Sequence, residues 1–557
     1  MNILLIASAF ANNPPGSTIE NALIADIPPE GFSGIIDFIP ALLPSDIPVD
    51  GISESYDGAW GACILGGYGL EINGIEVDLA VLNADIIPQD GYLDLDITIL
   101  VSLNNPSSPF SLETSLLCID DTCDGYVEPF EANVLAQVNL NVTDVDGDGN
   151  TELDVVIDNT TFDYALSGDD INLDSCAIGT IEDILNFIGL SIYDLVLNLA
   201  GPELESAVGE FIPELETTIE DAFAQANINE TVDLEGTELY INLSPADAAV
   251  SPDGLRISFN GSVSSDTVAD CVAAYDPGGS LSTSNGLPNI GDVPIGVDSS
   301  YQFAAITADD FLNQALYTVW RAGTLCQTVD DESFPLDTSI LNLLTEDAYT
   351  VLFPETQAMV IVTDPKSPPT LNMGTEAAIG IDIEELGLGF VAELDHRQTK
   401  IMTADLYTDV GVDINLDQNT GLVAVEIDLD PARVLVDISS NEFLPGQTDS
   451  LAASVTGQLD TVLGLVDIES LIGDLSFPLP AVEGLGLLNL QIAGAGSSGD
   501  DLGGFAELGA VPYTTGCDES GTEGCGDGCA AGTTSQSRGL LLGLLLFGAA
   551  FRRRHIG

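Results

Sequence analysis

The chain has 557 residues, and its 90 Asp and Glu against 10 Lys and Arg give a formal net charge of -80. This balance argues against nucleic-acid binding and against electrostatic docking on anionic lipid headgroups, because both need clustered cations. Hydrophobic residues make up 45 % of the chain, too many for a disordered acidic tail, so more than one domain can bury a core. The acidity therefore belongs to a solvated surface, which favours salty surroundings and bound cations.

Residues 1–17 are predicted to be an export signal and leader. The stretch from Asn2 to Ala11 is apolar and ends in Ala-Phe-Ala, a small-residue sequence typical of a cleavage site. It lacks the basic beginning of such signals. The alternative interpretation is a first buried strand.

Residues 18–274 are predicted to form a first domain that begins with short helices in 18–45, broken by prolines. From Gly69 to Asp174, apolar and polar residues alternate, which predicts strands with one buried face. From Thr180 the apolar spacing changes to three and four, which predicts two amphipathic helical stretches separated by a break at Gly201 and Pro202. Strands return at 237–243 and 254–263.

A short acidic sequence, DVDGDGNTELD from Asp144, is the one motif that carries chemistry. Its alternating carboxylates, followed by Gly149, can surround a hard cation such as Ca²⁺ with oxygen ligands. The Glu of an EF-hand is missing at the twelfth position, where Val155 stands, and the flanks are strand-like. An ordinary Asp/Gly turn is the alternative, and a real site would stiffen a hairpin. The candidate calcium ligands are Asp144, Asp146, Asp148, Asn150 and Glu152.

Residues 275–297 are rich in Gly, Ser, Pro and Asn without periodicity and are predicted to be a linker. The second domain, 298–510, then repeats the order of the first. An amphipathic helix is expected at 307–320, alternating segments follow, a long helix is expected at about 450–473, and strand-like segments close the domain.

The predicted fold class is therefore α+β, with two tandem elongated barrel-like domains of twisted antiparallel sheet, each with a long amphipathic helix. A long helix beside a curved sheet can leave an elongated apolar cavity, which suits an apolar ligand. Plain core packing is the alternative for the same side chains. The expected pocket residues are Ile184, Ile188, Leu195, Phe211, Leu215, Phe311 and Leu316.

Six of the nine cysteines lie in the body of the chain, which suits an oxidising compartment with up to three disulfides. Cys118 and Cys123 flank a tight acidic turn and are expected to pair. Cys271 with Cys326 and Cys63 with Cys176 are the natural remainder, and the sequence leaves this connectivity open.

The sequence offers no catalytic constellation. His396 is the only histidine in the body, and it lies between two alternating segments, where an exposed loop is expected. No nucleophile elbow, phosphate loop or zinc-type Cys/His pair is present, so the chain is expected to be a binding protein and not an enzyme.

Two segments resemble the family of bactericidal permeability-increasing protein and lipopolysaccharide-binding protein. They are YQFAAITADDFLNQALYTVWRAGTL at 301–325 and FPLPAVEGLGLLNLQIAG at 477–494. The resemblance covers roughly residues 18–510 and implies a boomerang of two barrels joined by a central sheet, with tubular pockets for acyl chains. The basic first half of the antibacterial relatives is missing. No Cys lies between Ala177 and Val250 to form the family's usual disulfide.

The end of the chain resembles the MYXO-CTERM sorting signals of bacterial surface proteins. A spacer rich in Gly, Ser and Cys (511–538) precedes an apolar run and three arginines within 539–557. The resemblance implies cleavage near Cys525 or Cys529 and display on the outer surface. A simple tail anchor is the alternative.

The sequence supports two alternative functions. The first is noncovalent binding or transfer of lipid acyl chains at a bacterial surface, with membrane contact through the C-terminal anchor. The second is a calcium-stiffened structural or adhesive β protein without a ligand cavity.

Overall fold

The computed structural model describes most of the chain between residues 12 and 511. The described ranges are 12–36, 46–49, 52–56, 68–104, 107–116, 119–144, 151–165, 170–174, 228–234, 237–283, 286–297, 300–329, 336–373, 379–394, 396–418, 422–428, 430–463, 477–478 and 485–511. The predicted helices in 180–223, residues 1–11 of the expected leader and the C-terminal signal at 539–557 all lie outside these ranges.

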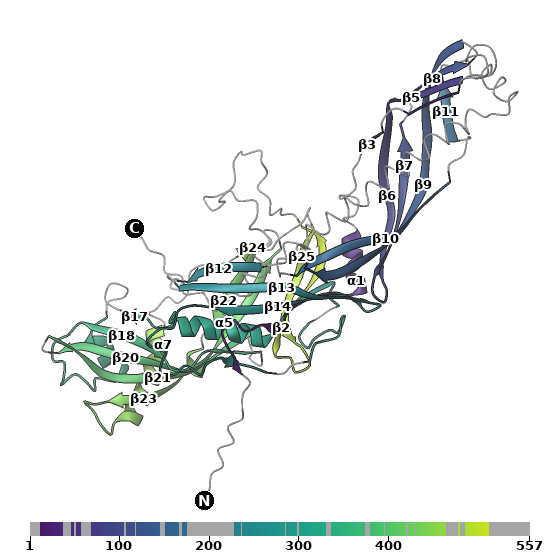
Figure 1. Ribbon diagram of the computed structural model, residues 1–557. Helices are drawn as coiled ribbons and strands as arrows, with labels where there is room; N and C mark the ends of the chain where they lie inside the picture. The colour runs from purple at the N-terminus through teal and green to yellow at the C-terminus, as the bar shows by residue number, and fades with distance from the viewer. Residues whose placement is uncertain are drawn as a thin grey trace, which may run out of the picture.

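The described chain is mostly β-strand, and its strands pair antiparallel in curled sheets along an elongated molecule (Figure 1). A seven-stranded sheet lies between a nine-stranded sheet and an eight-stranded sheet. A two-stranded ribbon, β1 (Asn12–Asn13) with β15 (Ser280–Leu281), is separate.

The central sheet is built from both halves of the sequence. Its strand order is β12-β13-β14-β2-β16-β26-β25. The first four are β12 (Ile228–Leu234), β13 (Thr237–Ser251), β14 (Gly254–Ser264) and β2 (Ile19–Ile27). The other three are β16 (Phe303–Thr307), β26 (Asp501–Ala510) and β25 (Leu485–Ala495).

The two halves contribute to this sheet by the same plan. In each half an early strand, β2 or β16, leads into a helix, and the last hairpin of that half pairs with the early strand. The helices are α1 (Pro29–Ile36) and α5 (Asp309–Ala322). The halves meet where β2 pairs with β16, with Ile24 opposite Ile306. A sheet that joins the halves is what the family resemblance implies.

The nine-stranded sheet belongs to the first half and forms one end of the molecule (Figure 1). Its long strands are β6 (Ile75–Pro88), β7 (Leu93–Leu103), β9 (Ile119–Thr143) and β10 (Glu152–Tyr164). The others are β3 (Asp46–Val49), β4 (Ile52–Tyr56), β5 (Tyr68–Asn73), β8 (Phe110–Leu116) and β11 (Ile171–Asp174). The predicted alternation between residues 69 and 174 is confirmed as strand.

The eight-stranded sheet belongs to the second half and lies toward the other end. Its main strands are β18 (Met359–Pro365), β20 (Ile379–Leu394), β21 (Arg397–Asp417), β22 (Leu422–Asp428) and β23 (Leu435–Asn441). Short strands β17 (Thr328–Val329), β19 (Thr370–Asn372) and β24 (Phe477–Pro478) complete it. The helices α6 (Thr338–Leu344) and α7 (Thr448–Leu463) supply Leu341 and Leu451 to its core. A short 3-10 turn, Pro431–Arg433, precedes β23.

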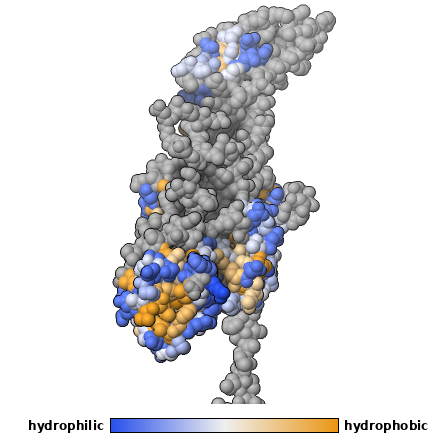
Figure 2. Space-filling model, turned by 90° about the vertical axis from the view of Figure 1, so that its left-hand side faces the viewer, coloured by the Kyte–Doolittle hydropathy of each residue, from blue (hydrophilic) through white to orange (hydrophobic). Residues whose placement is uncertain are grey.

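Apolar side chains gather on the surface at this end of the molecule. Figure 2 looks onto it and shows a patch of hydrophobic residues among hydrophilic ones. The exposed large apolar side chains of this part of the chain are Leu343, Val351, Leu352, Val362, Leu422 and Leu435.

Two sequence predictions differ from the fold. Residues 19–27 form strand β2 and not a helix. The strand is covered on both faces of the central sheet, so its sequence lacks the alternation of apolar and polar residues from which a half-buried strand is predicted. Helix α5 overlaps the helix predicted at 307–320 and ends two residues later, but its polar side is buried as well as its apolar side. It contacts β14 and β2 of the central sheet as well as β19 of the eight-stranded sheet.

The predicted linker is tied to the central sheet at several points. Arg256 Nη2 donates to Pro288 O at 2.8 Å, Gly291 N donates to Tyr301 Oη at 2.8 Å, and Gly286 N donates to Ser497 Oγ at 3.1 Å. The described parts of 275–297 are therefore fixed by hydrogen bonds to residues from both halves of the chain.

Candidate functional site

On one face of the nine-stranded sheet the described buried side chains are all apolar, and we call this face the inner face. Strands β7 and β9 place Leu95 opposite Ala136, Ile97 opposite Val134, Ile99 opposite Ala132 and Val101 opposite Phe130. All eight side chains are 7 % exposed or less. Strict alternation produces this face, because successive side chains of a strand point to opposite sides of the sheet.

The inner face continues onto the neighbouring strands. On β10, Val155 lies opposite Leu140 of β9, and on β6, Ala84 lies opposite Ile97. Phe110 and Leu112 of β8 are also buried. The result is a broad sheet surface on which no described buried side chain carries a charge.

The other face of the same strands is polar. Asp96, Glu131 and Asn133 are exposed there, and Thr98 Oγ1 donates to Asn133 Oδ1 at 3.0 Å. Leu135 is an exception, since it is 43 % exposed between the buried Val134 and Ala136.

The apolar interior behind the inner face does not stop at the end of its sheet. One contiguous buried cluster joins it to Phe32 of α1, to Leu23 of β2 and to Phe259 of β14. The same cluster includes Phe311 of α5 and reaches Ile379 and Val412 in the eight-stranded sheet. Since a domain ordinarily has its own separate core, this continuity through three sheets is a distinctive feature of the molecule.

Of the seven expected pocket residues, two are described. Phe311 and Leu316 lie on α5 and are 1 % and 8 % exposed. Phe311 packs over Gly261 of β14, where an added Cβ would lie 2.7 Å from Phe311 Cε2. Ile184, Ile188, Leu195, Phe211 and Leu215 lie outside the described residues.

Sequence reasoning missed the polar side of α5. Gln314 Nε2 donates to Pro14 O at 2.9 Å, and its Oε1 accepts from Val263 N at 2.7 Å. Asn313 Oδ1 accepts from Leu371 N at 2.8 Å, and Trp320 Nε1 donates to Pro365 O at 2.9 Å. Buried polar groups need such partners, so α5 is fixed to both sheets by hydrogen bonds as well as by packing.

One buried cation of the second half, Lys366, is held by two carboxylates. Lys366 Nζ lies 2.9 Å from Glu385 Oε1 and 2.9 Å from Asp405 Oδ2. Burial lowers the pKa of Lys366, but the hydrogen bonds to Asp405 and Glu385 outweigh burial and raise it above its usual value. This lysine is therefore a structural cation and not a nucleophile.

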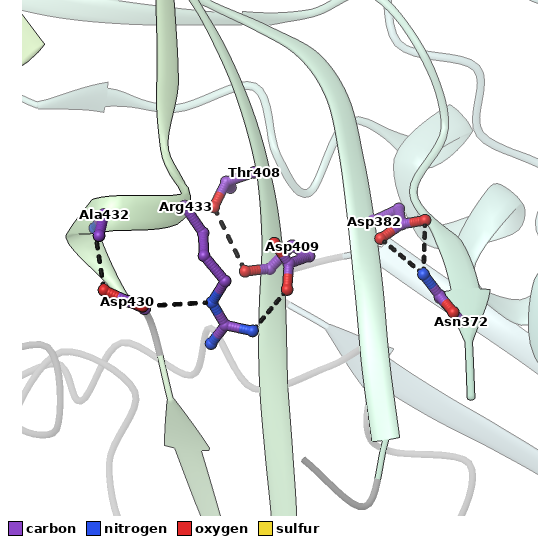
Figure 3. Close-up of polar contacts among 7 residues, drawn as sticks. All are labelled: Asn372, Asp382, Thr408, Asp409, Asp430, Ala432 and Arg433. Carbon is purple, nitrogen blue, oxygen red and sulfur yellow. Dashed lines mark hydrogen bonds and ion pairs between the residues drawn. The ribbon is translucent and has the colours of Figure 1, made fainter. Parts of the chain in front are cut away.

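A polar row crosses the eight-stranded sheet (Figure 3). Asp382 of β20 lies directly opposite Asp409 of β21. Asn372 Nδ2 donates to Asp382 Oδ2 at 3.1 Å, and Arg433 Nη1 donates to Asp409 Oδ2 at 2.6 Å. Each of the two opposed carboxylates thus has a donor of its own, which offsets their repulsion.

The expected calcium loop is described at its two ends. Asp144 directly follows the last residue of β9, Thr143, which pairs with Glu152 at the start of β10. Asp146, Asp148 and Asn150 lie outside the described residues. Within the residues that are described, no group of three or more His, Cys, Asp or Glu side chains is arranged to hold a metal ion.

Cys271 and Cys326 form a disulfide with a Cα–Cα distance of 6.5 Å, as expected. Cys123 is also disulfide-bonded. Its expected partner Cys118, and the pair Cys63 and Cys176, lie outside the described residues. His396 is 99 % exposed and contacts Glu393, in keeping with the loop position expected for it.

Among the described residues, no helix is long and apolar enough to cross a membrane.

No protein-family model matches the chain, and no curated protein matches it. Among solved structures, the crystal structure of lipopolysaccharide binding protein is similar over 90 % of this chain and 99 % of that chain, with 14 % identity and a TM-score of 0.48. The crystal structure of P47 of Clostridium botulinum E1 is similar over 89 % of this chain and 100 % of that chain, with 10 % identity and a TM-score of 0.23.

Proposed function

We propose that the chain binds the acyl chains of lipids noncovalently against the inner face of the nine-stranded sheet. The observation that carries the proposal is the uninterrupted apolar surface of β7 and β9, where Leu95, Ile97, Ile99 and Val101 face apolar partners. An acyl chain is recognised by contact with such a surface, because each buried methylene contributes about 0.8 kcal/mol.

The continuity of the apolar interior supports an elongated ligand. The cluster that begins on the inner face extends through the central sheet to Ile379 and Val412. A long flexible hydrocarbon can follow such a path, whereas a compact apolar ligand would use only part of it. We infer that each half forms a barrel-like container and that the central sheet joins the two.

Two variants on neighbouring residues test the proposal. Val134→Asn puts an amide on the inner face, opposite Ile97, whereas Leu135→Asn puts the same group on the outer face, opposite Asp96. Neither changes the net charge. Wild type and Leu135→Asn, purified without detergent, should show lipid-sized adducts in native mass spectrometry, and Val134→Asn should lose them.

Far-UV circular dichroism and the urea midpoint establish first that both variants are folded. A wild-type protein with a clean apo mass would overturn the proposal. Equal lipid content in two folded variants would remove the inner face as the binding surface.

A structural role for Ca²⁺ is a second, separate proposal. The pairing of Thr143 with Glu152 places the carboxylates of Asp144 and Glu152 at the two ends of the loop 145–150. A cation held between these ends would close the hairpin and stiffen β9 and β10. It would take no part in chemistry, since we propose a binding protein and not an enzyme.

Calcium should raise the melting temperature of the wild type, and Asp144→Asn should abolish most of that rise. The matched control is Asp154→Asn on β10, which removes the same charge outside the loop. A rise of equal size in Asp144→Asn would assign the effect to general screening of the acidic surface.

We also propose that the protein is exported and held at the outer surface of a bacterial cell by its C-terminal segment. The order of spacer, apolar run and arginines in 511–557 supports this. Deletion of 539–557 should release the protein into the medium, and whole-cell protease treatment should digest the intact form at the surface. Retention of the deleted form inside the cell would contradict the proposal.

A further inference from the structure

We infer that the amino terminus left by export processing after Ala11 is bound within the fold, by the carboxylate of Asp310 on α5. Only an exported chain is cut at this point, so the inference rests on the export proposed above and goes beyond lipid binding. Its basis is the position of strand β1 beside the start of α5.

Cleavage after the sequence Ala-Phe-Ala turns an uncharged amide into a cation. Hydrolysis of the bond between Ala11 and Asn12 by a signal peptidase consumes one water molecule. It leaves a carboxylate on the released segment and an α-ammonium on Asn12, which ordinarily stays charged below about pH 8. The processed chain thus gains a positive charge at the first residue of β1, far ahead of its first basic side chain, Arg256.

Strand β1 places this end beside the turn that follows β15. Asn12 lies opposite Leu281 in antiparallel register. Opposite residues of such a pair have Cα atoms about 5 Å apart. Because the two strands run in opposite directions, the backbone nitrogen of Asn12 lies toward Ser282, the residue after Leu281.

Asp310 is held at the same turn. Ser282 Oγ donates to Asp310 Oδ2 at 3.1 Å, and Thr283 N donates to Asp310 Oδ1 at 2.7 Å. The Asp310 side chain is half-buried. Both donors are uncharged, so they fix the carboxylate in place without neutralising it. The nitrogen of Asn12 and the carboxylate of Asp310 therefore meet at the same residue, Ser282.

The same side of α5 also fastens the residues that follow Asn12. Gln314 lies one helical turn after Asp310, on the same side of the helix, and is fully buried. Its Nε2 donates to Pro14 O at 2.9 Å and to Ser17 O at 3.0 Å. The step from Pro14 back to Asn12 spans at most about 7 Å, so the end of the processed chain stays close to Asp310.

The charges around this position favour a cation. Burial raises the pKa of Asp309, and the negative charges of Asp310 and Asp500 raise it further. An ammonium within about 6 Å of a carboxylate stabilises the charged form of both groups. The uncut chain cannot form this pair, because its Asn12 nitrogen is an amide. Processing therefore ties the first residue of the exported protein to a helix of the second half.

The pKa of the α-amine tests the pairing directly. Protein recovered after export should begin at Asn12 by amino-terminal sequencing. Reductive methylation with 13C-formaldehyde labels the α-amine together with Lys366 and Lys400, and NMR follows the titration of each. The α-amine should bind its proton at least about threefold more tightly in the wild type than in Asp310→Asn, because a nearby anion stabilises the ammonium. At about 500 mM salt this difference should shrink at least twofold.

Three matched forms separate the pairing from general effects of charge and folding. Asp253→Asn removes an exposed charge from another part of the central sheet and should leave the titration of the α-amine as in the wild type. Asp310→Glu keeps the charge and should retain at least half of the effect, which guards against a folding defect in Asp310→Asn. A chain that begins at Ser8 carries its ammonium away from Asn12 and should titrate alike with and without the carboxylate of Asp310.

The outcomes distinguish this inference from the export proposal. A protein that stays in the cell with residues 1–11 attached contradicts export, and the inference falls with it. An exported protein that begins at Asn12 but has the same α-amine pKa with and without the carboxylate of Asp310 leaves export standing and overturns the inference. An exported protein that begins after Pro14 overturns it in the same way. An equal effect of Asp253→Asn would assign the pKa to net charge and would also overturn it.

Discussion

Arg256 and Asp26 are joined by two hydrogen bonds across the central sheet. Arg256 Nε donates to Asp26 Oδ1 at 2.7 Å, and its Nη2 donates to Oδ2 at 2.6 Å. The two residues are cross-strand partners on β14 and β2, and Asp26 is fully buried. Because Arg256 also donates to Pro288 O, this pair ties the early strand, the closing hairpin and the linker of the first half together.

Replacement of Arg256 alone should therefore lower the free energy of unfolding more than replacement of both Arg256 and Asp26. Arg256→Met leaves the carboxylate of Asp26 buried without its cation, and we expect a loss of about 3–5 kcal/mol in the free energy of unfolding. The double variant Arg256→Met with Asp26→Asn should recover at least half of this loss. Urea denaturation measures both. A loss below about 1 kcal/mol in the single variant would mean that solvent or another group compensates Asp26.

The disulfide between Cys271 and Cys326 should contribute strongly to stability. It closes a loop with a sequence separation of 55 residues, which contains the linker and α5. Closure of such a loop restricts the unfolded chain by about 4 kcal/mol. The double variant Cys271→Ser with Cys326→Ser should lower the urea midpoint accordingly. An unchanged midpoint would show that the loop is already restricted in the unfolded state.

Gly261 is required for the contact between β14 and α5. A Cβ at this position would lie 2.7 Å from Ala22 Cβ, from Leu243 Cδ2 and from Phe311 Cε2. Gly261→Ala should therefore destabilise the protein by about 1–3 kcal/mol through overpacking. Adding Phe311→Leu should relieve part of this cost, and a thermal melt of the three variants measures it. Additive losses in the double variant would place the strain at Ala22 or Leu243 instead.

Tyr349 should make the fold sensitive to alkaline pH. Burial raises the pKa of Tyr349 to about 12 from its usual value near 10. Below pH 10 the hydroxyl is neutral in the folded and in the unfolded protein. As the pH rises above 10 it ionises first in the unfolded chain, because its pKa is lower there. Stability should then fall between about pH 10 and 12, by roughly 2–3 kcal/mol from this group.

Tyr349→Phe removes this contribution. It also removes the hydrogen bond that Tyr349 Oη donates to Asn441 Oδ1 at 2.8 Å. Asn441 Oδ1 keeps its hydrogen bond from Leu444 N at 3.0 Å, so the variant should lose only about 1 kcal/mol at neutral pH. The urea midpoint of the variant should decline less steeply above pH 10 than that of the wild type. Parallel declines would assign the alkaline sensitivity to other tyrosines.

The half-buried strands could be predicted from the sequence, because burial on one face leaves a period of two. Residues 132–140 of β9 alternate between buried and less buried without a break, and apolar and polar residues alternate in the same way except at Leu135. Strand β2 could not be predicted in this way. Both of its faces are covered, so Leu23, Ile24 and Ala25 follow one another with no polar residue between them.

The polar contacts escaped prediction for a different reason. Asp26 and Arg256 are 230 residues apart, and Gln314 reaches Pro14 over 300 residues. In a chain with 90 acids, nothing in the local sequence marks the one carboxylate that a given arginine will meet. The burial of α5 could not be predicted either. Asn313 and Gln314 are polar residues of the kind found on a solvated helix face, and only their distant hydrogen-bond partners explain why they are buried.

The order of strands in the central sheet has a consequence for the timing of folding. Strand β2 is synthesised well before its partners, because its neighbours β14 and β16 come more than 200 residues later, and β16 is flanked by β26 near residue 510. During synthesis, the two edges of β2 stay without their native partners until more than 200 further residues have been made. The native sheet can therefore close only after the last hairpin has been made, and we expect this late step to limit the rate at which the native protein appears.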